Sequence, residues 1–245
     1  MKVVLSKDDV ELGIKAAKLS ADIINEAIMQ KGYATIVMST GASQFTTISQ
    51  LIKQDIDWSK VTMFHLDEYI DLDENHPASF IKYLKERFVS KVNLKKVNFV
   101  DTSIGVQNII DKLTLELGKE EVDLGLIGIG ENAHIAFNDP PADFETTDAF
   151  KVVQLNEACR NQQYREGWFD TLEDVPTKAL SMTVNQILKC KKIISAVPYK
   201  VKAKAIYDTL STQGVTNMIP ATILKTHTDV TIFVDEESAS LIKFD

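Results

Sequence analysis

Short apolar runs alternate along this chain with stretches of helical periodicity, and this alternation limits the fold more than any other feature. The clearest run extends from Leu124 to Ile129, where Leu, Ile and Gly alone occur. Such a run is typical of a strand buried on both faces of a parallel sheet. Strands that alternate with helices predict a mostly parallel sheet with helices on both faces.

The rest of the pattern predicts the order of the elements. A first helix follows from apolar residues between Leu12 and Ile28 and ends near Gly32. We expect strands at 35–38, 61–66, 96–100, 152–155, 192–197 and 230–234, and helices at 43–53, 79–88, 106–117 and 200–210. No repeat or linker divides the sequence, so residues 1–245 are expected to form one Rossmann-like α/β domain.

Charge and cysteine content narrow the class of protein. Lys and Arg number 27 and Asp and Glu 35, and the resulting net charge of −8 argues against a general nucleic-acid binder. No apolar run approaches the roughly 20 residues that span a bilayer, and the N-terminus lacks a signal-peptide pattern. Cys159 and Cys190 are too few for a disulfide framework. We therefore expect a cytoplasmic protein without nucleic-acid or membrane partners, and a homo-oligomer is compatible with the sequence.

Polar side chains suited to chemistry follow the 124–129 run. Loops that leave the carboxyl ends of parallel strands are where open α/β folds bind ligands. This loop carries Asn132, His134, Asn138 and Asp139. We expect a catalytic loop here.

The same loop also fits a dinucleotide fingerprint, through Gly128, Gly130 and Ala133. That fingerprint needs a crossover helix directly after the glycines. The prolines at 140 and 141 leave room for only about two helical turns. The sequence therefore disfavours nicotinamide binding.

Two carboxylates, Asp67 and Glu68, follow the strand expected at 61–66. One of two neighbours at a strand end can point into the ligand crevice, where partial burial would raise its pKa and suit it to general base catalysis. A helix cap or solvated turn is the alternative, and the pattern alone slightly favours that alternative.

Two further features indicate an anionic ligand. The segment Ser39–Ser43 combines hydroxyl residues with a glycine ahead of a helix, which suits phosphate, although in isolation an ordinary N-cap at Ser43 is the favoured explanation. Lys200, Lys202 and Lys204 open a later helix, where cations oppose the helix dipole. An anion explains them, and a solvated basic face is the alternative for two of the three.

These motifs together resemble glucosamine-6-phosphate deaminases. The shared motifs are TGAS, LDEY, HPASF, GIGENAHIAFNDP, VPTKALSMTV and K-x-K-A, and they occur in the family's order from about Thr35 to Glu237. The resemblance implies a Rossmann-like fold and the conversion of glucosamine 6-phosphate and water to fructose 6-phosphate and ammonia. It implies no redox cofactor.

The resemblance also implies roles for individual residues. Asp67 matches the general base that moves a proton between C2 and C1, and His134 the group that opens the sugar ring. Asp139 stands where the family has a glutamate that supports the histidine, and Asn132 where many members have an aspartate. The shorter Asp139 is expected to reach the histidine through a backbone shift or a water.

The phosphate site follows from the same resemblance. Its expected residues are the loop Thr40, Gly41, Ala42 and Ser43, with Lys202 as the phosphate-binding lysine. The family adds an arginine from a mobile segment before the VP-x-x-AL motif, and here both Arg160 and Arg165 are candidates.

Other activities remain open at this stage. A galactosamine-6-phosphate isomerase or deaminase shares the chemistry, a 6-phosphogluconolactonase-type hydrolase shares the fold, and a non-catalytic sugar-phosphate sensor uses a related one. LDEY and HIAFNDP differ from the lactonase motifs, and the first 30 residues lack a helix-turn-helix segment. No third ligand at typical spacing accompanies His65 with Asp67 or His134 with Asp139, so we expect no metal.

Overall fold

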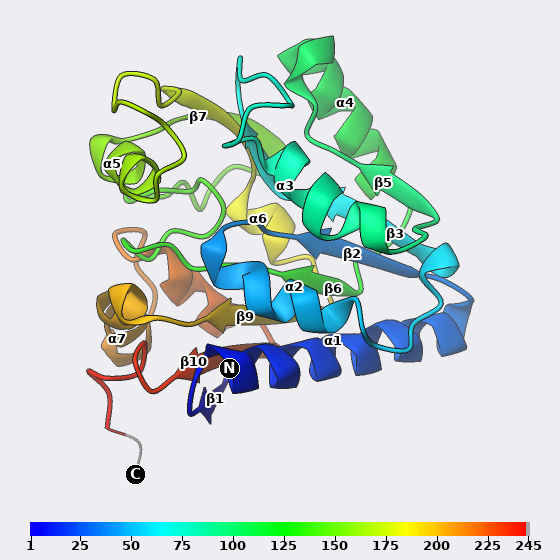
Figure 1. The fold of residues 1–245 in the computed structure, drawn as a ribbon, viewed down its shortest axis with the longest axis horizontal. Coiled ribbons are helices and arrows are strands. Elements are labelled where there is room, and N and C mark those ends of the chain that lie inside the picture. Colours follow the sequence, from blue (N-terminus) through cyan, green and yellow to red (C-terminus); the bar gives the residue numbers. More distant parts are fainter. Residues whose placement is uncertain (244–245) are drawn as a thin grey trace.

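A parallel sheet forms the centre of the molecule, shown in Figure 1. The computed structural model describes residues 1–243. Within them the main sheet has seven strands in the order β1-β10-β9-β6-β2-β3-β5, and every neighbouring pair is parallel. The strands are β1 (Lys2–Ser6), β2 (Ala34–Met38), β3 (Val61–His65), β5 (Lys96–Asn98), β6 (Leu124–Leu126), β9 (Lys192–Val197) and β10 (Val230–Asp235). The predicted fold class is confirmed.

Helices cover both faces of this sheet. All five residues of β2 are buried. Its consecutive residues Val37 and Met38 pack into different hydrophobic clusters, because successive side chains of a strand point to opposite faces of the sheet. One cluster joins the sheet to α1 (Asp9–Lys31), α2 (Phe45–Leu51) and α3 (Phe80–Arg87). The other cluster joins it to α4 (Val106–Leu117), α6 (Val184–Ile187) and α7 (Ala203–Ser211).

The ends of α1 follow from its local sequence. Asp8 caps the N-terminus, since its carboxylate accepts a hydrogen bond of 2.8 Å from the Glu11 amide. Gly32 ends the helix in the left-handed conformation, at φ 85°, and its amide bonds to the Ile28 carbonyl. The predicted end near Gly32 is confirmed.

A second, antiparallel sheet was not expected. It contains β4 (Asp67–Tyr69), β8 (Lys178–Met182) and β7 (Phe150–Gln154), in the order β4-β8-β7. The strand expected at 61–66 ends at His65, and the chain then enters this second sheet at Asp67. Figure 1 places β7 beside α5 (Glu157–Arg165), away from the main sheet.

Several predicted bounds differ from the structure. The 124–129 run is a strand only to Leu126, after which the chain turns into a loop. Residues 42–44 and 200–202 form short 3-10 helices before α2 and α7, in place of the first turns of longer α-helices. The bounds of β9 and α4 agree with the prediction. None of the helices described within residues 1–243 has the length and apolar character that crossing a bilayer requires.

Candidate active site

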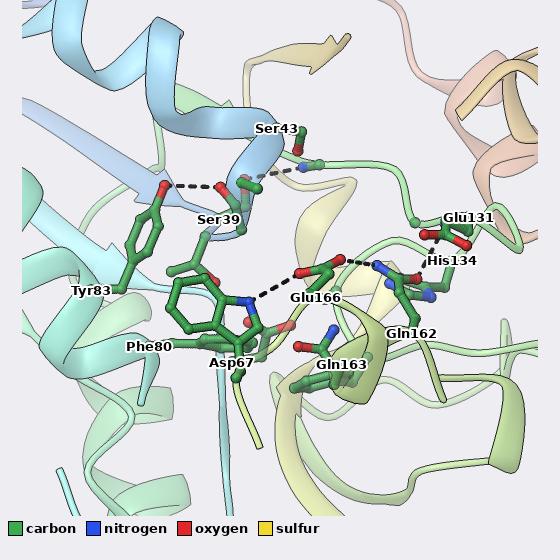
Figure 2. A pocket seen from close by; sticks show the side chains of 18 of the residues that line it. Ser39, Ser43, Asp67, Phe80, Tyr83, Glu131, His134, Gln162, Gln163 and Glu166 are labelled. Atoms are coloured by element: carbon green, nitrogen blue, oxygen red, sulfur yellow. Dashed lines mark hydrogen bonds between the residues drawn. The ribbon is translucent and has the colours of Figure 1, made fainter. Parts of the chain in front are cut away.

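A cavity of about 340 Å³ opens at the carboxyl ends of β2, β6 and β9. Pockets of this size hold small ligands, and this edge of a parallel sheet is where the loop chemistry was expected. Figure 2 shows Asp67 and His134 among the side chains around it. Eight of the predicted site residues line the cavity: Thr40, Gly41, Ala42, Ser43, Asp67, His134, Arg165 and Lys202.

Behind His134 lie the two other residues of the catalytic loop. The Nδ1 atom of His134 is 2.7 Å from Oδ1 of Asn132 and 3.1 Å from Oδ1 of Asp139. Asn132 also donates from Nδ2 to the same oxygen of Asp139, at 3.0 Å. Because both neighbours of Nδ1 are acceptors, we assign the ring proton to Nδ1, which leaves Nε2 as the proton acceptor.

The carboxylate of Asp139 is held in its charged form. Its side chain is only 8% exposed, and this burial opposes ionisation. Contacts with His134, Asn132 and Cys159 outweigh burial and lower the pKa of Asp139 below its usual value. The expected backbone shift or bridging water is not needed, because the shorter side chain meets the imidazole directly.

Asp67 begins β4 and is 5% exposed. Burial, followed by the neighbouring Glu68 carboxylate, raises the pKa of Asp67 to about 8, although the Phe137 amide counteracts the shift. Phe137 belongs to the same loop as His134, so that loop also lies against Asp67. A carboxyl group with a pKa near the working pH suits general base catalysis.

Glu68 is not among the residues that line this cavity, and its contacts give it a structural role. Its Oε2 accepts from the Ser79 hydroxyl at 3.0 Å and from the Ile81 amide at 2.8 Å, and Oε1 accepts from the Tyr69 amide at 2.9 Å. These contacts hold Glu68 at the N-terminus of α3. The two alternatives raised by the sequence therefore apply to different neighbours: a cavity carboxylate at 67 and a cap at 68.

The loop from Ser39 to Ser43 forms one end of the cavity. Gly41 has φ 103°, a conformation that favours glycine, and its carbonyl accepts from the Tyr83 hydroxyl at 3.0 Å. The alternative of an N-cap at Ser43 is wrong, because neither the 3-10 helix nor α2 has a side-chain cap. The Ser43 hydroxyl accepts from Nε2 of Gln44 and lines the cavity.

One lysine of the predicted three faces this loop. Lys202 is 7% exposed and lines the cavity, and among residues 1–243 no carboxylate forms an ion pair with it. Burial lowers the pKa of Lys202, while Glu166 and Glu131 counteract the shift. Lys200 is exposed, and Lys204 pairs with Asp208 at 2.6 Å on the surface. A buried cation beside a hydroxyl-rich loop suits an anion.

The structure separates the two candidate arginines. Arg165 lines the cavity from the end of α5, and its guanidinium pairs with Oε2 of Glu131 at 2.9 Å. Arg160 lies elsewhere on α5, where it donates to the carbonyls of Leu172 at 2.6 Å and Val175 at 3.2 Å. Arg165 can reach a ligand in the cavity, while Arg160 fixes the segment after the helix.

Sequence reasoning missed most of what α5 contributes. Gln162 and Gln163 line the cavity from this helix, followed by Glu166 and Trp168. Glu166 accepts from Nε2 of Gln162 at 2.8 Å and from Nε1 of Trp168 at 3.2 Å, as Figure 2 shows for the first pair. The sequence NQQYREGW is too polar for helical periodicity to indicate a helix over the cavity.

A third side chain with metal-ligating atoms lies beside the histidine. Cys159 of α5 brings its sulfur to within 4.8 Å of ligand atoms of both His134 and Asp139. Spacing along the sequence had indicated no such third ligand. His134 and Asp139 already contact each other, and burial raises the pKa of the Cys159 thiol, which disfavours the thiolate that binds metals. The three side chains therefore fit proton transfer better than metal binding.

Sequence and structure comparisons identify the proteins that this chain is similar to. Residues 7–233 match the family described as glucosamine-6-phosphate isomerases/6-phosphogluconolactonase. A glucosamine-6-phosphate deaminase of Thermoanaerobacter pseudethanolicus is 36% identical over 255 residues, covering 99% of this chain and 95% of that protein. The corresponding enzyme of Mycoplasma mycoides subsp. mycoides is 32% identical and covers 98% and 97%.

Solved structures agree with these sequence relationships. A monomeric glucosamine-6-phosphate deaminase superposes with a TM-score of 0.90 at 31% identity, covering 98% of this chain and all of the other. A 6-phosphogluconolactonase from Trypanosoma brucei gives a TM-score of 0.80 at 14% identity, covering 99% and 98%, which shows a shared fold alone. The chain therefore belongs to the glucosamine-6-phosphate isomerase/6-phosphogluconolactonase family, among the glucosamine-6-phosphate deaminases.

Proposed function

We propose that this protein converts glucosamine 6-phosphate and water to fructose 6-phosphate and ammonia. One observation carries the proposal: the buried carboxyl group of Asp67 and the imidazole of His134, which contacts Asp139, face the same cavity. Lys202 lines this cavity too, and no carboxylate within residues 1–243 forms an ion pair with it. This reaction needs a base at a carbon next to a carbonyl, a proton-transfer group at the ring oxygen and an anchor for the phosphate.

His134 is proposed to open the sugar ring. With the proton on Nδ1, the free Nε2 takes the proton of the C1 hydroxyl and returns it to the ring oxygen as the C1–O5 bond breaks. Asp139 and Asn132 hold the imidazole in this tautomer through the contacts at Nδ1. The product is the open-chain aldehyde, whose carbonyl activates the hydrogen on C2.

Asp67 is proposed to move that hydrogen. Its carboxylate takes the proton from C2, which gives an enolate. The substrate's ammonium group at C2 passes a proton to the C1 oxygen to form the enolamine, and the protonated Asp67 then returns its proton to C1, which leaves an iminium at C2. The resulting iminium at C2 adds water and releases ammonia, which leaves the ketone of fructose 6-phosphate. Asp67 must be ionised to begin this sequence, and its raised pKa makes it a stronger base once it is.

The phosphate is proposed to bind at the Ser39–Ser43 end of the cavity. The backbone and hydroxyl groups of residues 40–43 supply donors, and Lys202 supplies a buried positive charge. Arg165 lies close enough to line the same cavity but is paired with Glu131. We propose that the phosphate draws Arg165 from Glu131, because a dianion competes well for a guanidinium.

A single chain is proposed to suffice for activity. This proposal is supported by a solved relative that is described as monomeric. The two cysteines are free and buried, which supports a cytoplasmic location.

A coupled assay tests the function. Purified protein is given glucosamine 6-phosphate, galactosamine 6-phosphate or 6-phosphogluconolactone, while ammonia, ketose phosphate and acid are followed. We expect ammonia and fructose 6-phosphate in equal amounts from the first substrate. Faster ammonia release from the galactosamine epimer would assign the chain to that sugar, and acid release from the lactone without any ammonia would refute the proposal.

A further inference from the structure

The buried thiol of Cys159 has no part in the reaction described above. Cys159 is 1% exposed and belongs to α5, a different segment from the loop that carries His134 and Asp139. Its sulfur nevertheless lies within 4.8 Å of ligand atoms of both residues. A thiol on α5 that lies this close to His134 and Asp139 can influence both side chains.

Asp139 offers this thiol an open position. Its Oδ1 atom serves both His134 and Asn132, whereas Oδ2 is buried and has no hydrogen-bond partner in residues 1–243. A buried acceptor left unsatisfied is costly, and a thiol is a weak donor. Burial raises the pKa of Cys159, so the sulfur keeps the proton that it would donate.

We propose that Cys159 is a positioning residue that acts through Asp139 on His134. The thiol donates toward the outer carboxylate oxygen and holds the carboxylate where Oδ1 meets Nδ1 of the imidazole. The inference rests on the proposed function, in which His134 must present an unprotonated Nε2 to the sugar. It adds α5 to the machinery that sets the tautomer of the histidine.

The position of Cys159 also connects two ends of the cavity. The helix that carries it also carries Arg165, which we propose moves to the phosphate, as well as Gln162 and Gln163. The same short helix therefore carries groups that serve both the proposed phosphate end and the histidine end of the cavity.

Other ionisable groups surround the thiol and enter any test by pH. Asp139, Asp67 and Glu166 each raise the pKa of Cys159 after burial has done so. Tyr69 is a further neighbour: burial raises the pKa of its hydroxyl most, and Cys159 raises it further. A pH profile of activity mixes these groups with the titration of Asp67, so the histidine itself is the better reporter.

The experiment compares three substitutions at position 159. Cys159→Ser keeps a donor, while Cys159→Ala and Cys159→Val remove it, the first with a smaller and the second with a larger side chain, so a loss shared by both cannot come from side-chain size alone. We expect Ala and Val to lower kcat about tenfold, the effect of one unsatisfied buried acceptor, with KM within about twofold. Ser is expected to retain kcat within about threefold of wild type, because a hydroxyl is also a donor.

A spectroscopic measurement separates positioning from packing. The ¹⁵N shifts of the His134 ring, assigned with His134→Gln, are expected to report Nδ1–H in the wild type and in Cys159→Ser. A mixture of tautomers is expected in Cys159→Ala and Cys159→Val. Cys190→Ala is the matched control, because it also removes a buried free thiol. We expect this control to leave the His134 signals unchanged.

The outcomes separate the two proposals. Wild-type tautomers and kcat in both Ala and Val variants would overturn the role of Cys159, as would equal losses in Ala, Val and Ser. Wild-type protein that releases no ammonia would instead overturn the proposed function, and the nitrogen shifts would still show whether the thiol holds the histidine. If the Ala variant does not fold, Val against Ser gives the same comparison.

Discussion

The ring of His134 packs directly against the backbone of Gly130. A Cβ atom at position 130 would lie 2.2 Å from Cε1 of the imidazole, far below any normal contact. The same turn joins the two residues through a 2.9 Å bond from the Gly130 amide to the His134 carbonyl. Gly130 therefore fixes where the imidazole can lie, and the close approach explains a glycine that was first considered as part of a dinucleotide fingerprint.

Gly130→Ala is expected to remove most activity, because the methyl group pushes the imidazole away from Asn132 and Asp139. We expect kcat to fall by about a hundredfold, in line with loss of general acid–base catalysis. Steady-state assays measure kcat, and a thermal melt shows whether the variant keeps its stability. Gly118→Ala is the control, since a Cβ there meets only atoms at 3.5 Å or more; equal activity losses in both variants would contradict this account.

Asp67→Asn is expected to abolish ammonia release, with a loss of about a thousandfold or more, because the amide cannot take the C2 proton. Binding of an unreactive hexitol 6-phosphate should remain, since Asp67 belongs to β4 and not to the loop proposed to bind the phosphate. Calorimetry measures this binding. Near wild-type turnover in Asp67→Asn would remove the residue from the mechanism.

His134→Gln is expected to slow the ring-closed substrate by about a hundredfold, because glutamine cannot exchange a proton with the ring oxygen. An open-chain substrate analogue bypasses that step and should lose much less activity. Comparing kcat/KM for the two forms measures the difference. An equal loss on both forms would exclude the ring-opening role.

The arginines are expected to differ in effect. Arg165→Ala should raise KM for glucosamine 6-phosphate about tenfold, the value of a charge-assisted contact, with little change in the melting temperature. Arg160→Ala should instead lower the melting temperature, because two carbonyls after α5 lose their donor. A large rise in KM for Arg160→Ala alone would exchange the two roles.

The raised pKa of Asp67 couples stability to pH. Its folded-state pKa, about 8, lies above the unfolded value of 3.8, so the folded state binds the extra proton. The stability that this proton contributes is present below pH 4 and is lost as pH rises through 8. Asp67→Asn should therefore gain stability relative to wild type between pH 5 and pH 9, measured by urea denaturation. A constant difference across that range would contradict the raised pKa.

The sequence pattern predicted the bounds of helices and strands that depend on nearby residues. The bounds of α4 and β9 follow from apolar periodicity, and the end of α1 from Gly32. Neither β8 nor its pairing with Asp67 could be predicted, because Asp67 meets Ser181 over a separation that no periodicity records. Strand pairing at long range depends on tertiary packing.

The site divides in the same way. Asp67, His134 and the 40–43 loop follow strands whose ends meet at one edge, but for Asp67 and the loop that position alone favoured a cap or a turn, and the family motifs were needed to propose them as site residues. The choice between Arg160 and Arg165 needed the direction of side chains on α5, which spacing does not give. Cys159 was missed for the same reason, since β7 and the loops around it separate it from Asp139 along the chain.

Asp67 and His134 come from different layers of the fold. Asp67 belongs to the three-stranded antiparallel sheet, whereas His134 belongs to the loop that follows β6 of the seven-stranded sheet. The loop that carries His134 is nevertheless tied to the antiparallel layer, because the Phe137 amide donates to the Ser181 hydroxyl and the Asn138 side-chain amide donates to the Met182 carbonyl of β8. A change in β8 is therefore felt by both side chains at once, and their mutual placement is preserved only while the two layers stay joined.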